Sequence, residues 1–420
     1  MRKWILIFLV ITIIHSVFIP TLMAQTGPGQ YTEEAPLGSW NILGPDTAAG
    51  LGSGFCRLAR ATLSEVIYSN PALLTKLPPL TFSLSSSFNQ TQLFSYWLVN
   101  TGVISTRGNL TARTWQLDHL GLSWRAGRWT IGLGLALTEN YGRPGLEYRY
   151  VYNQVVYNQM QIWQVGHLSG YAISLAGRLT RKLSLGASLI YERGYLERSL
   201  DEFWTQEEIQ LLDYRYQKIT GFRAVAGLSY EISDRLSLGF SLSPPYIRKV
   251  KGESSLTYLT PLTEIETGSQ ASDRIKRPLV LGLGGKLVIN QHLDAYLDIL
   301  YFGWKRYRFS YFGEDQFRNF RDTVRIGAGL EYRTRFRFLG RTWASPYYLG
   351  LAVDPQPDLE VRSTYYFLTF GSGLKNELLG LSFSAALGLE SGSGHALKRH
   401  KLAITLDFYP DLKKNSGKIK

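Results

Sequence analysis

The stretch WTIGLGLALT, residues 129–138, alternates strictly between large apolar side chains and small or hydroxyl-bearing ones. A period of two is typical of a β-strand whose two faces meet different surroundings. The same alternation returns at residues 183–189, 236–242 and 381–389. The large residues that share one face of the first stretch are Trp129, Ile131, Leu133, Leu135 and Leu137. The pattern predicts an all-β protein whose strands are apolar on one side only.

Segments of this kind begin near residues 80, 115, 128, 171, 182, 221, 235, 278, 292, 323, 345, 364, 379 and 400. Long and short connections alternate between them, and Arg125–Arg128 is one of the tight turns. Bacterial outer-membrane barrels have an even number of strands, short periplasmic turns and longer external loops. We therefore expect a transmembrane antiparallel β-barrel of about fourteen strands over residues 80–409, with both termini periplasmic. One short connection, Arg333–Trp343, is longer than this rule prefers.

Aromatic residues on the apolar parity gather near both ends of the expected strands, as in the two girdles of a membrane barrel. A soluble β-sandwich is the alternative, but it does not require long and short connections to alternate. The aromatic residues near the short turns are Trp124, Trp129, Tyr230, Tyr332, Tyr347 and Phe408, and the aromatic residues near the long loops are Tyr171, Tyr191, Phe222 and Tyr301.

Composition limits the remaining possibilities. Residues 1–24 carry Arg2 and Lys3 before an apolar run and a small residue at Ala24, which indicates a secretory signal peptide. The single cysteine, Cys56, excludes an internal disulfide and a thiolate metal cluster. The formal net charge of +13 is dispersed and partly lies in the hydrophilic tail 410–420, so anionic lipid explains it as well as nucleic acid does. We expect no nucleic-acid partner.

Residues 25–79 lack the alternation and are rich in Gly, Pro and small residues. Such a segment ahead of a barrel is a periplasmic tail or a hatch folded into the lumen. Glycine recurs on the small-residue face of the strands, where it permits another backbone to approach closely or simply eases strand curvature. The sequence leaves these two explanations open, and we predict the hatch.

The run GSGFCRLARATLSEVIYSNPALLTKLPPLTFS, residues 52–83, contains Asn70, Pro71 and Ala72 and resembles the junction between hatch and first strand in FadL/TodX-type outer-membrane transporters. Residues 277–304, 324–332 and 348–357 follow in the order seen in that family. The resemblance covers most of the chain after the signal. It departs from the family in a hatch that is poor in alanine and aspartate, and in the tail that follows Tyr409.

The resemblance implies passive uptake of hydrophobic molecules such as long-chain fatty acids or hydrocarbons, with hatch movement and lateral release into the membrane. In that family, lateral release is associated with an interruption of the third strand. Here Gly132 and Gly134 would tolerate a bulge in that strand and are our candidates for the opening. The alternative is a PorV-like barrel, which binds proteins as a component of a secretion system.

Two groups of residues are candidates for binding the ligand. The third external loop, Arg193–Thr220, has nearly helical amphipathic spacing and predicts an apolar groove, or else a lid over neighbouring loops. Its candidate contacts are Leu200, Phe203, Trp204, Leu211 and Leu212. Inward-facing charges should mostly pair. Asp298 and Arg325 are the expected pair, whereas Arg223 or Lys286 would clamp a carboxylate headgroup. The other expected inward charges are Arg178, Asp294 and Glu331.

Enzymatic signatures are missing from the sequence. The six histidines show no paired metal-ligand spacing, and no G-x-S-x-G motif occurs. We therefore expect a monomeric protein that is not an enzyme, has no cofactor or metal, and interacts with a hydrophobic small molecule and with outer-membrane lipids.

Overall fold

The computed structural model describes residues 46–61, 65–92, 104–105, 111–152, 154–311, 314–316, 320–338, 340–359, 362–392 and 396–410. The predicted signal peptide, residues 25–45 of the predicted hatch, and the tail from residue 411 onward lie outside the described residues. None of the described helices is long and apolar enough to cross a membrane.

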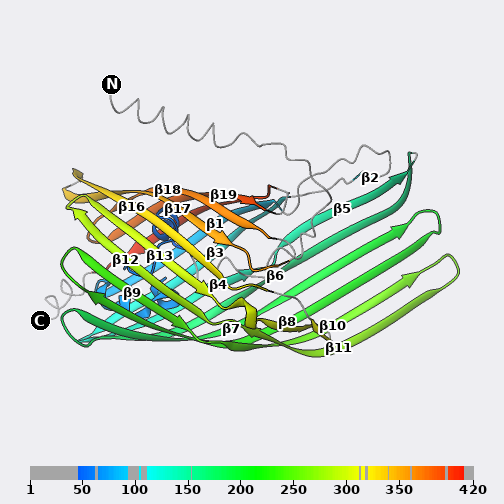
Figure 1. Ribbon diagram of the computed structural model, residues 1–420, viewed down its shortest axis with the longest axis horizontal. Coiled ribbons are helices and arrows are strands. Elements are labelled where there is room, and N and C mark those ends of the chain that lie inside the picture. The colour runs from blue at the N-terminus through cyan, green and yellow to red at the C-terminus, as the bar shows by residue number, and fades with distance from the viewer. Residues whose placement is uncertain are drawn as a thin grey trace, which may run out of the picture.

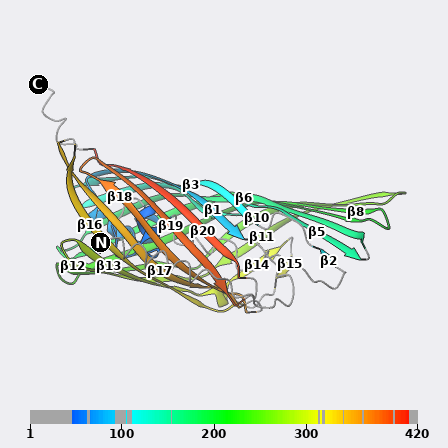
Figure 2. The same ribbon diagram turned by 90° about the horizontal axis from the view of Figure 1, so that it is seen from above.

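Fourteen antiparallel strands close into a barrel, which confirms the predicted fold class (Figures 1 and 2). The last strand pairs with the first from Phe82 opposite Phe408 to Thr91 opposite Arg399. The wall strands are β1 (Leu80–Gln92), β3 (Thr111–Ala126), β4 (Trp129–Asn140), β6 (Val155–Arg178), β7 (Leu183–Trp204), β8 (Ile209–Glu231), β9 (Leu236–Ser243), β12 (Val280–Asn290), β13 (Leu293–Phe302), β16 (Thr323–Phe338), β17 (Arg341–Pro355), β18 (Thr364–Lys375), β19 (Leu379–Ser391) and β20 (Lys398–Phe408).

The outer surface of the wall is apolar, as the alternation predicts. Leu133 is 47% exposed and Phe222 is 62% exposed, whereas Thr130 and Ser188 on the inner face are buried. Aromatic rings lie in contact around the outside: Tyr191 is 6.3 Å from Tyr171 and 5.0 Å from Phe222, between ring centroids. A surface of this kind is stable only against lipid, because so much exposed apolar area is unfavourable in water.

Several strands continue far beyond the wall on the side of the long connections (Figure 1). The strands β7 and β8 form one uninterrupted hairpin, joined through residues 205–208. The wall strand β9 ends before Pro244 and Pro245, after which β10 (Tyr246–Leu259) continues and pairs with β11 (Glu264–Arg277). Proline cannot donate to a sheet ladder, so it marks the break where this hairpin leaves the wall.

The prediction of an amphipathic helical groove over Arg193–Thr220 is wrong, because this region is a β-hairpin. Its unbroken register places Leu200, Trp204 and Leu211 on one face and Phe203 with Leu212 on the other. A strand alternates its side chains, so the apolar residues do not form one stripe. The connection at Arg333–Trp343 is also tighter than expected, since β16 and β17 extend to Phe338 and Arg341 around Gly340 at φ 71°.

The described residues 46–61 and 65–79, here called the lumenal segment, lie inside the barrel. They comprise α2 (Ala48–Gly52), α3 (Val66–Ser69) and the 3-10 helix η2 (Pro71–Lys76). Leu51, Leu58, Ile67, Leu73 and Leu74 are fully buried. These side chains pack against inward residues of the wall, such as Ala386 beside α2 and Ala136 beside α3. The segment therefore occupies the short-turn half of the lumen.

Candidate functional site in the barrel lumen

The predicted motif residues Asn70, Pro71 and Ala72 are all buried in the lumen. The Nδ2 group of Asn70 donates to the carbonyl oxygen of Leu58 at 2.7 Å and to that of Leu228 on β8 at 3.1 Å. Pro71 begins η2, where its missing N–H costs nothing. Asn70 thus ties two turns of the lumenal segment to the wall.

Inner-face glycines allow the lumenal segment to touch the backbone of the wall. A methyl group at Gly239 would lie 1.8 Å from the carbonyl oxygen of Leu58, and one at Gly227 would lie 2.2 Å from Oδ1 of Asn70. On β17, one at Gly350 would lie 2.2 Å from the amide nitrogen of Gly54. Side chains at these positions would push the segment away from the wall.

Buried charges fix the start of the lumenal segment. Asp46 contacts Arg57 within the segment and accepts from Nζ of Lys401 on β20 at 3.4 Å. Burial raises the pKa of the Asp46 carboxyl, but the charges of Arg57 and Lys401 outweigh it and hold this pKa below its ordinary value. Asp46 is therefore an ionised anchor at neutral pH.

Arg60 makes a second anchor on another part of the wall, at β16. Its guanidinium lies 2.6 Å from Oε2 of Glu331 on β16 and stands over the rings of Tyr296 and Tyr348, at 4.8 and 4.9 Å from their centroids. Burial lowers the pKa of Arg60, yet Glu331 and the two tyrosines reverse that effect and raise it. A cation held by one carboxylate and two aromatic faces resists displacement.

The predicted pair Asp298 and Arg325 faces the lumen, but each side chain contacts the lumenal segment directly. Oδ2 of Asp298 accepts from the backbone amides of Arg57 at 2.6 Å and Leu58 at 2.9 Å. The guanidinium of Arg325 stands 4.5 Å from the centroid of Phe55. We correct the expected direct ion pair accordingly: two backbone amides bind Oδ2 of Asp298, and Arg325 lies against an aromatic ring instead of this carboxylate.

The two predicted headgroup clamps already have protein partners. Nζ of Lys286 lies 3.0 Å from Asp294 and 5.8 Å from the ring centroid of Tyr296. Nε of the buried Arg223 lies 4.0 Å from Oε1 of Glu192. Pairing was the expected fate of most inward charges, and both of these cations follow it.

A set of charged side chains, here called the charge cluster, closes the lumen on the long-loop side of the lumenal segment. Nη1 of Arg248 lies 2.8 Å from Oε1 of Glu139, its Nε lies 2.7 Å from Glu192, and Nη2 of Arg277 lies 3.1 Å from Glu139. These contacts join β4 to β10 and β11 across the lumen. The members are Glu139, Glu192, Arg223, Arg248 and Arg277, all buried.

Sequence reasoning missed four members of the charge cluster, Glu139, Glu192, Arg248 and Arg277, and identified only Arg223. Arg248 and Arg277 lie on β10 and β11, which the sequence presented as loop rather than strand. Their spacing after Pro244–Pro245 and before Pro278 was the available signal, because a proline at a strand end can mark a bend as well as a loop.

The wall is interrupted between β3 and β4. Their backbone pairing runs from Ala126 opposite Trp129 only as far as His119 opposite Ala136. Beyond this point β3 pairs with β1, while β4 and β5 (Arg143–Tyr152) pair with β6. A register shift between Leu137 and Glu139 accompanies the separation. The described strands β3 and β4 therefore part on the long-loop side.

Side chains bridge this interruption where the backbone does not. Nδ2 of Asn140 donates to Oε1 of Gln116 at 2.7 Å and approaches Oγ1 of Thr114 at 3.4 Å. The predicted opening residues, Gly132 and Gly134, lie nearer the short turn, where β4 is paired with both of its neighbours. Their missing side chains instead make room for Ile67, Leu74 and Tyr68 of the lumenal segment.

Comparison with known proteins agrees with this fold. The profile of the BamG family matches residues 58–337. A FadL homologue of Pseudomonas aeruginosa has 15% identity and a TM-score of 0.63 over 88% of this chain and 99% of its own. The toluene transporter TodX of P. putida gives 14% and 0.58 over 88% and 99%, and TbuX of Ralstonia pickettii gives 15% and 0.56 over 88% and 98%.

A search of curated proteins finds no match. Among the described residues, no group of three His, Cys, Asp or Glu side chains could hold a metal ion. The solved structures share the fold at low identity, whereas the family profile covers well over half of the sequence. On that match the chain belongs to the BamG family.

Proposed function

We propose that this protein is an outer-membrane channel for passive movement of hydrophobic molecules, such as long-chain fatty acids or aromatic hydrocarbons, and that it performs no enzymatic chemistry. A molecule enters from the long-hairpin side, passes when the lumenal segment shifts, and leaves sideways between β3 and β4. In this proposal both termini face the periplasm and the working unit is a monomer.

The interruption between β3 and β4 carries the proposal. A closed ladder gives an apolar molecule no way from lumen to lipid, because breaking paired strands in the membrane exposes several backbone groups at once. Here β3 and β4 are unpaired beyond His119 and Ala136, and the side chain of Asn140 bridges them. Exposed Leu117 and Trp115 would receive an apolar molecule on the outer surface.

The comparisons support this choice of ligand class. Two of the similar structures are named as toluene transporters and another as a monoaromatic hydrocarbon channel. The enclosed lumen is consistent with a gated route for single molecules rather than with an open aqueous pore.

Cross-linking across the interruption tests the proposal. Gln116→Cys with Asn140→Cys, joined through two disulfides by a short bifunctional methanethiosulfonate reagent, should stop uptake of a labelled long-chain fatty acid and of toluene into proteoliposomes. Reduction should restore it. Leu122→Cys with Leu133→Cys is the matched control, because these residues face each other where the strands are already paired.

Two results would overturn the proposal in different ways. Full uptake with the 116–140 cross-link in place would reject the lateral exit. Uptake by the unmodified protein no faster than by empty liposomes, for both probes, would reject the channel itself.

A protein-binding role, as in PorV-like barrels, is the second candidate. It is favoured by the long hairpins β7–β8 and β10–β11, which present extended sheet beyond the wall instead of an apolar groove. Stable copurification of one protein in amounts equal to the barrel, lost when β10–β11 is shortened, would support this role over transport.

A further inference from the structure

Six cationic side chains lie together on the outward face of the strands that leave the wall. The residues Arg248, Val250 and Asp273 are buried, so the residues that alternate with them face outward. Exposed cations occupy these outward positions on four neighbouring strands. They are Arg193 on β7, Lys218 on β8, Lys249 and Lys251 on β10, and Arg274 and Lys276 on β11, here called the cationic patch.

The cationic patch lies just beyond the outer aromatic girdle. Arg193 follows Tyr191 by two residues on the same face of β7, and Tyr191 is directly opposite Phe222. On β10, Lys249 similarly follows Ile247, which is 52% exposed. Two residues of strand advance about 7 Å. Aromatic girdles lie at the level of the lipid headgroups, so the patch lies where headgroup phosphates are found.

The arrangement places like charges face to face. Lys249 is directly opposite Arg274, and Lys251 is directly opposite Lys218. Like charges opposite one another destabilise a sheet. Within the described part of the chain, none of the six cations forms an ion pair with a carboxylate; Lys218 merely approaches the ring of Tyr216, at 5.5 Å. Bridging anions would turn this repulsion into attraction.

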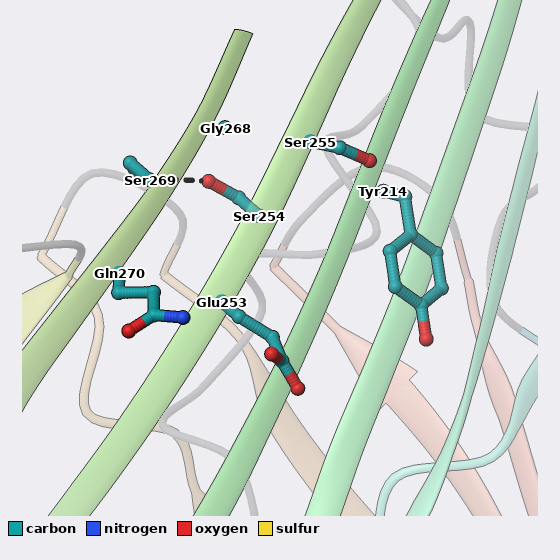
Figure 3. Close-up of a pocket in the computed structure, with 7 residues that line it drawn as sticks. All are labelled: Tyr214, Glu253, Ser254, Ser255, Gly268, Ser269 and Gln270. Atoms are coloured by element: carbon teal, nitrogen blue, oxygen red, sulfur yellow. Dashed lines mark hydrogen bonds between the residues drawn. The ribbon is translucent and has the colours of Figure 1, made fainter.

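A polar pocket of about 440 Å³ lies next along the same strands (Figure 3). Glu253 follows Lys251 by two residues on the outward face, opposite Gln270, and Tyr214 is opposite Ser255 on the neighbouring strand. Gly268 leaves a depression among these groups, since a methyl group there would meet only the carbonyl oxygen of Ser254, at 3.6 Å. Hydroxyl, amide and carboxylate groups beside an aromatic ring suit the hydroxyls of a sugar.

We propose that the outward face of β7, β8, β10 and β11 binds a phosphorylated glycolipid of the outer leaflet, with its phosphates on the cationic patch and an adjoining sugar in the pocket. The acyl chains would lie on the apolar wall below, beside Phe222 and Ile247. Along the strands away from the wall, the exposed apolar residues, the cations and the polar pocket then match the lipid chains, the phosphates and the sugar in that order.

The test uses the full-length protein in neutral detergent, with lipid A titrated in and binding followed by native mass spectrometry. The variant Lys218→Gln, Lys249→Gln, Lys251→Gln, Arg274→Gln should bind lipid A roughly 600-fold more weakly, since each of the four basic residues near a membrane surface contributes roughly fivefold. The unmodified protein should prefer lipid A to its dephosphorylated form. Without anionic lipid, the variant should be at least as thermally stable, because the opposed like charges are gone.

The control removes the same charge from the short-turn end, with Arg128→Gln, Arg181→Gln, Arg235→Gln and Arg341→Gln. It should bind lipid A normally. Gly268→Leu should fill the pocket and weaken binding of lipopolysaccharide that carries core sugars, but not of lipid A. Equal binding by the patch variant and the unmodified protein, or equal loss in the control, would overturn the site. Heat-modifiable gel migration verifies that each variant is folded.

Discussion

Glycines on the inner face determine how closely the lumenal segment approaches the wall. The sequence left two explanations for these glycines open, close backbone approach and strand curvature. A methyl group added at Gly239 or at Gly350 would lie closer than ordinary contact distance to backbone atoms of the lumenal segment. Close approach therefore explains these positions, although no sequence pattern could have said which lumenal residues they would contact.

Substitution of Gly239 tests this explanation. Gly239→Ala should displace Leu58 from the wall and destabilise the packing of the lumenal segment against the wall by about 1–3 kcal/mol, the usual cost of overpacking. Hydrogen exchange of the amides around Leu58 should become faster. Gly285→Ala on the adjoining strand is the control, because its methyl group would meet only Leu238, at 3.9 Å. Equal exchange in the two variants would contradict the proposed contact.

Asp46 gives a prediction about pH. Its pKa in the folded protein is below the ordinary value of 3.8, so its contribution to stability is complete above that value and is lost only as the pH falls through the folded pKa. The lumenal segment should therefore stay anchored throughout the mildly acidic range. The ratio of amide exchange rates between Asp46→Asn and the unmodified protein cancels the intrinsic pH dependence. This ratio should stay constant and above one until strong acid is reached; convergence at mild acidity would refute the lowered pKa.

At the scale of elements, alternation predicted the wall strands well and failed beyond the wall. All fourteen predicted segments correspond to wall strands, because lipid outside and small residues inside impose a strict period of two. Only the first residues of β10 and the last of β11 keep a buried/exposed alternation, and the parts of these strands farther from the wall carry no such contrast. The helical spacing of the third loop was misleading for the same reason.

The β10–β11 extension should be dispensable for folding. Lys251 lies directly opposite Ser272, so residues 252–271 can be replaced by an Asn-Gly turn without changing the register. The wall pairs of β9 with β8 and β12 remain in place. The shortened protein should keep its heat-modifiable migration and a melting temperature within a few degrees of the original. Loss of the folded band would mean that the extension is part of the barrel's stability.

At the scale of the whole molecule, the outer surface of the barrel can be predicted from the sequence, whereas the contacts in the lumen cannot. Exposed apolar residues, girdles and turns are each visible in a single strand's sequence. The anchors Asp46–Lys401 and Arg60–Glu331 join residues 355 and 271 positions apart. Inward parity identified Glu331 as a lumenal charge, but its partner depends on how the lumenal segment folds within the closed wall.

The charge cluster should act as a barrier to apolar molecules, separate from the lumenal segment. Changing Glu139, Glu192, Arg223, Arg248 and Arg277 to Met, with Tyr141 and Tyr246 to Phe, removes every charge and the two hydroxyls that donate to the glutamates. Replacement of buried ion pairs by apolar residues of similar volume is often neutral or stabilising, so the barrel should fold.

Uptake of the fatty acid and toluene by this apolar variant should rise several-fold, because the molecules no longer displace paired charges. Glu139→Ala is the contrasting variant. It leaves Arg248 and Arg277 without a partner they share, so a stability loss of about 3–5 kcal/mol is expected. If the apolar variant folds but transports no faster than the original, the lumenal segment alone limits passage, and the cluster serves only to hold β4, β10 and β11 together.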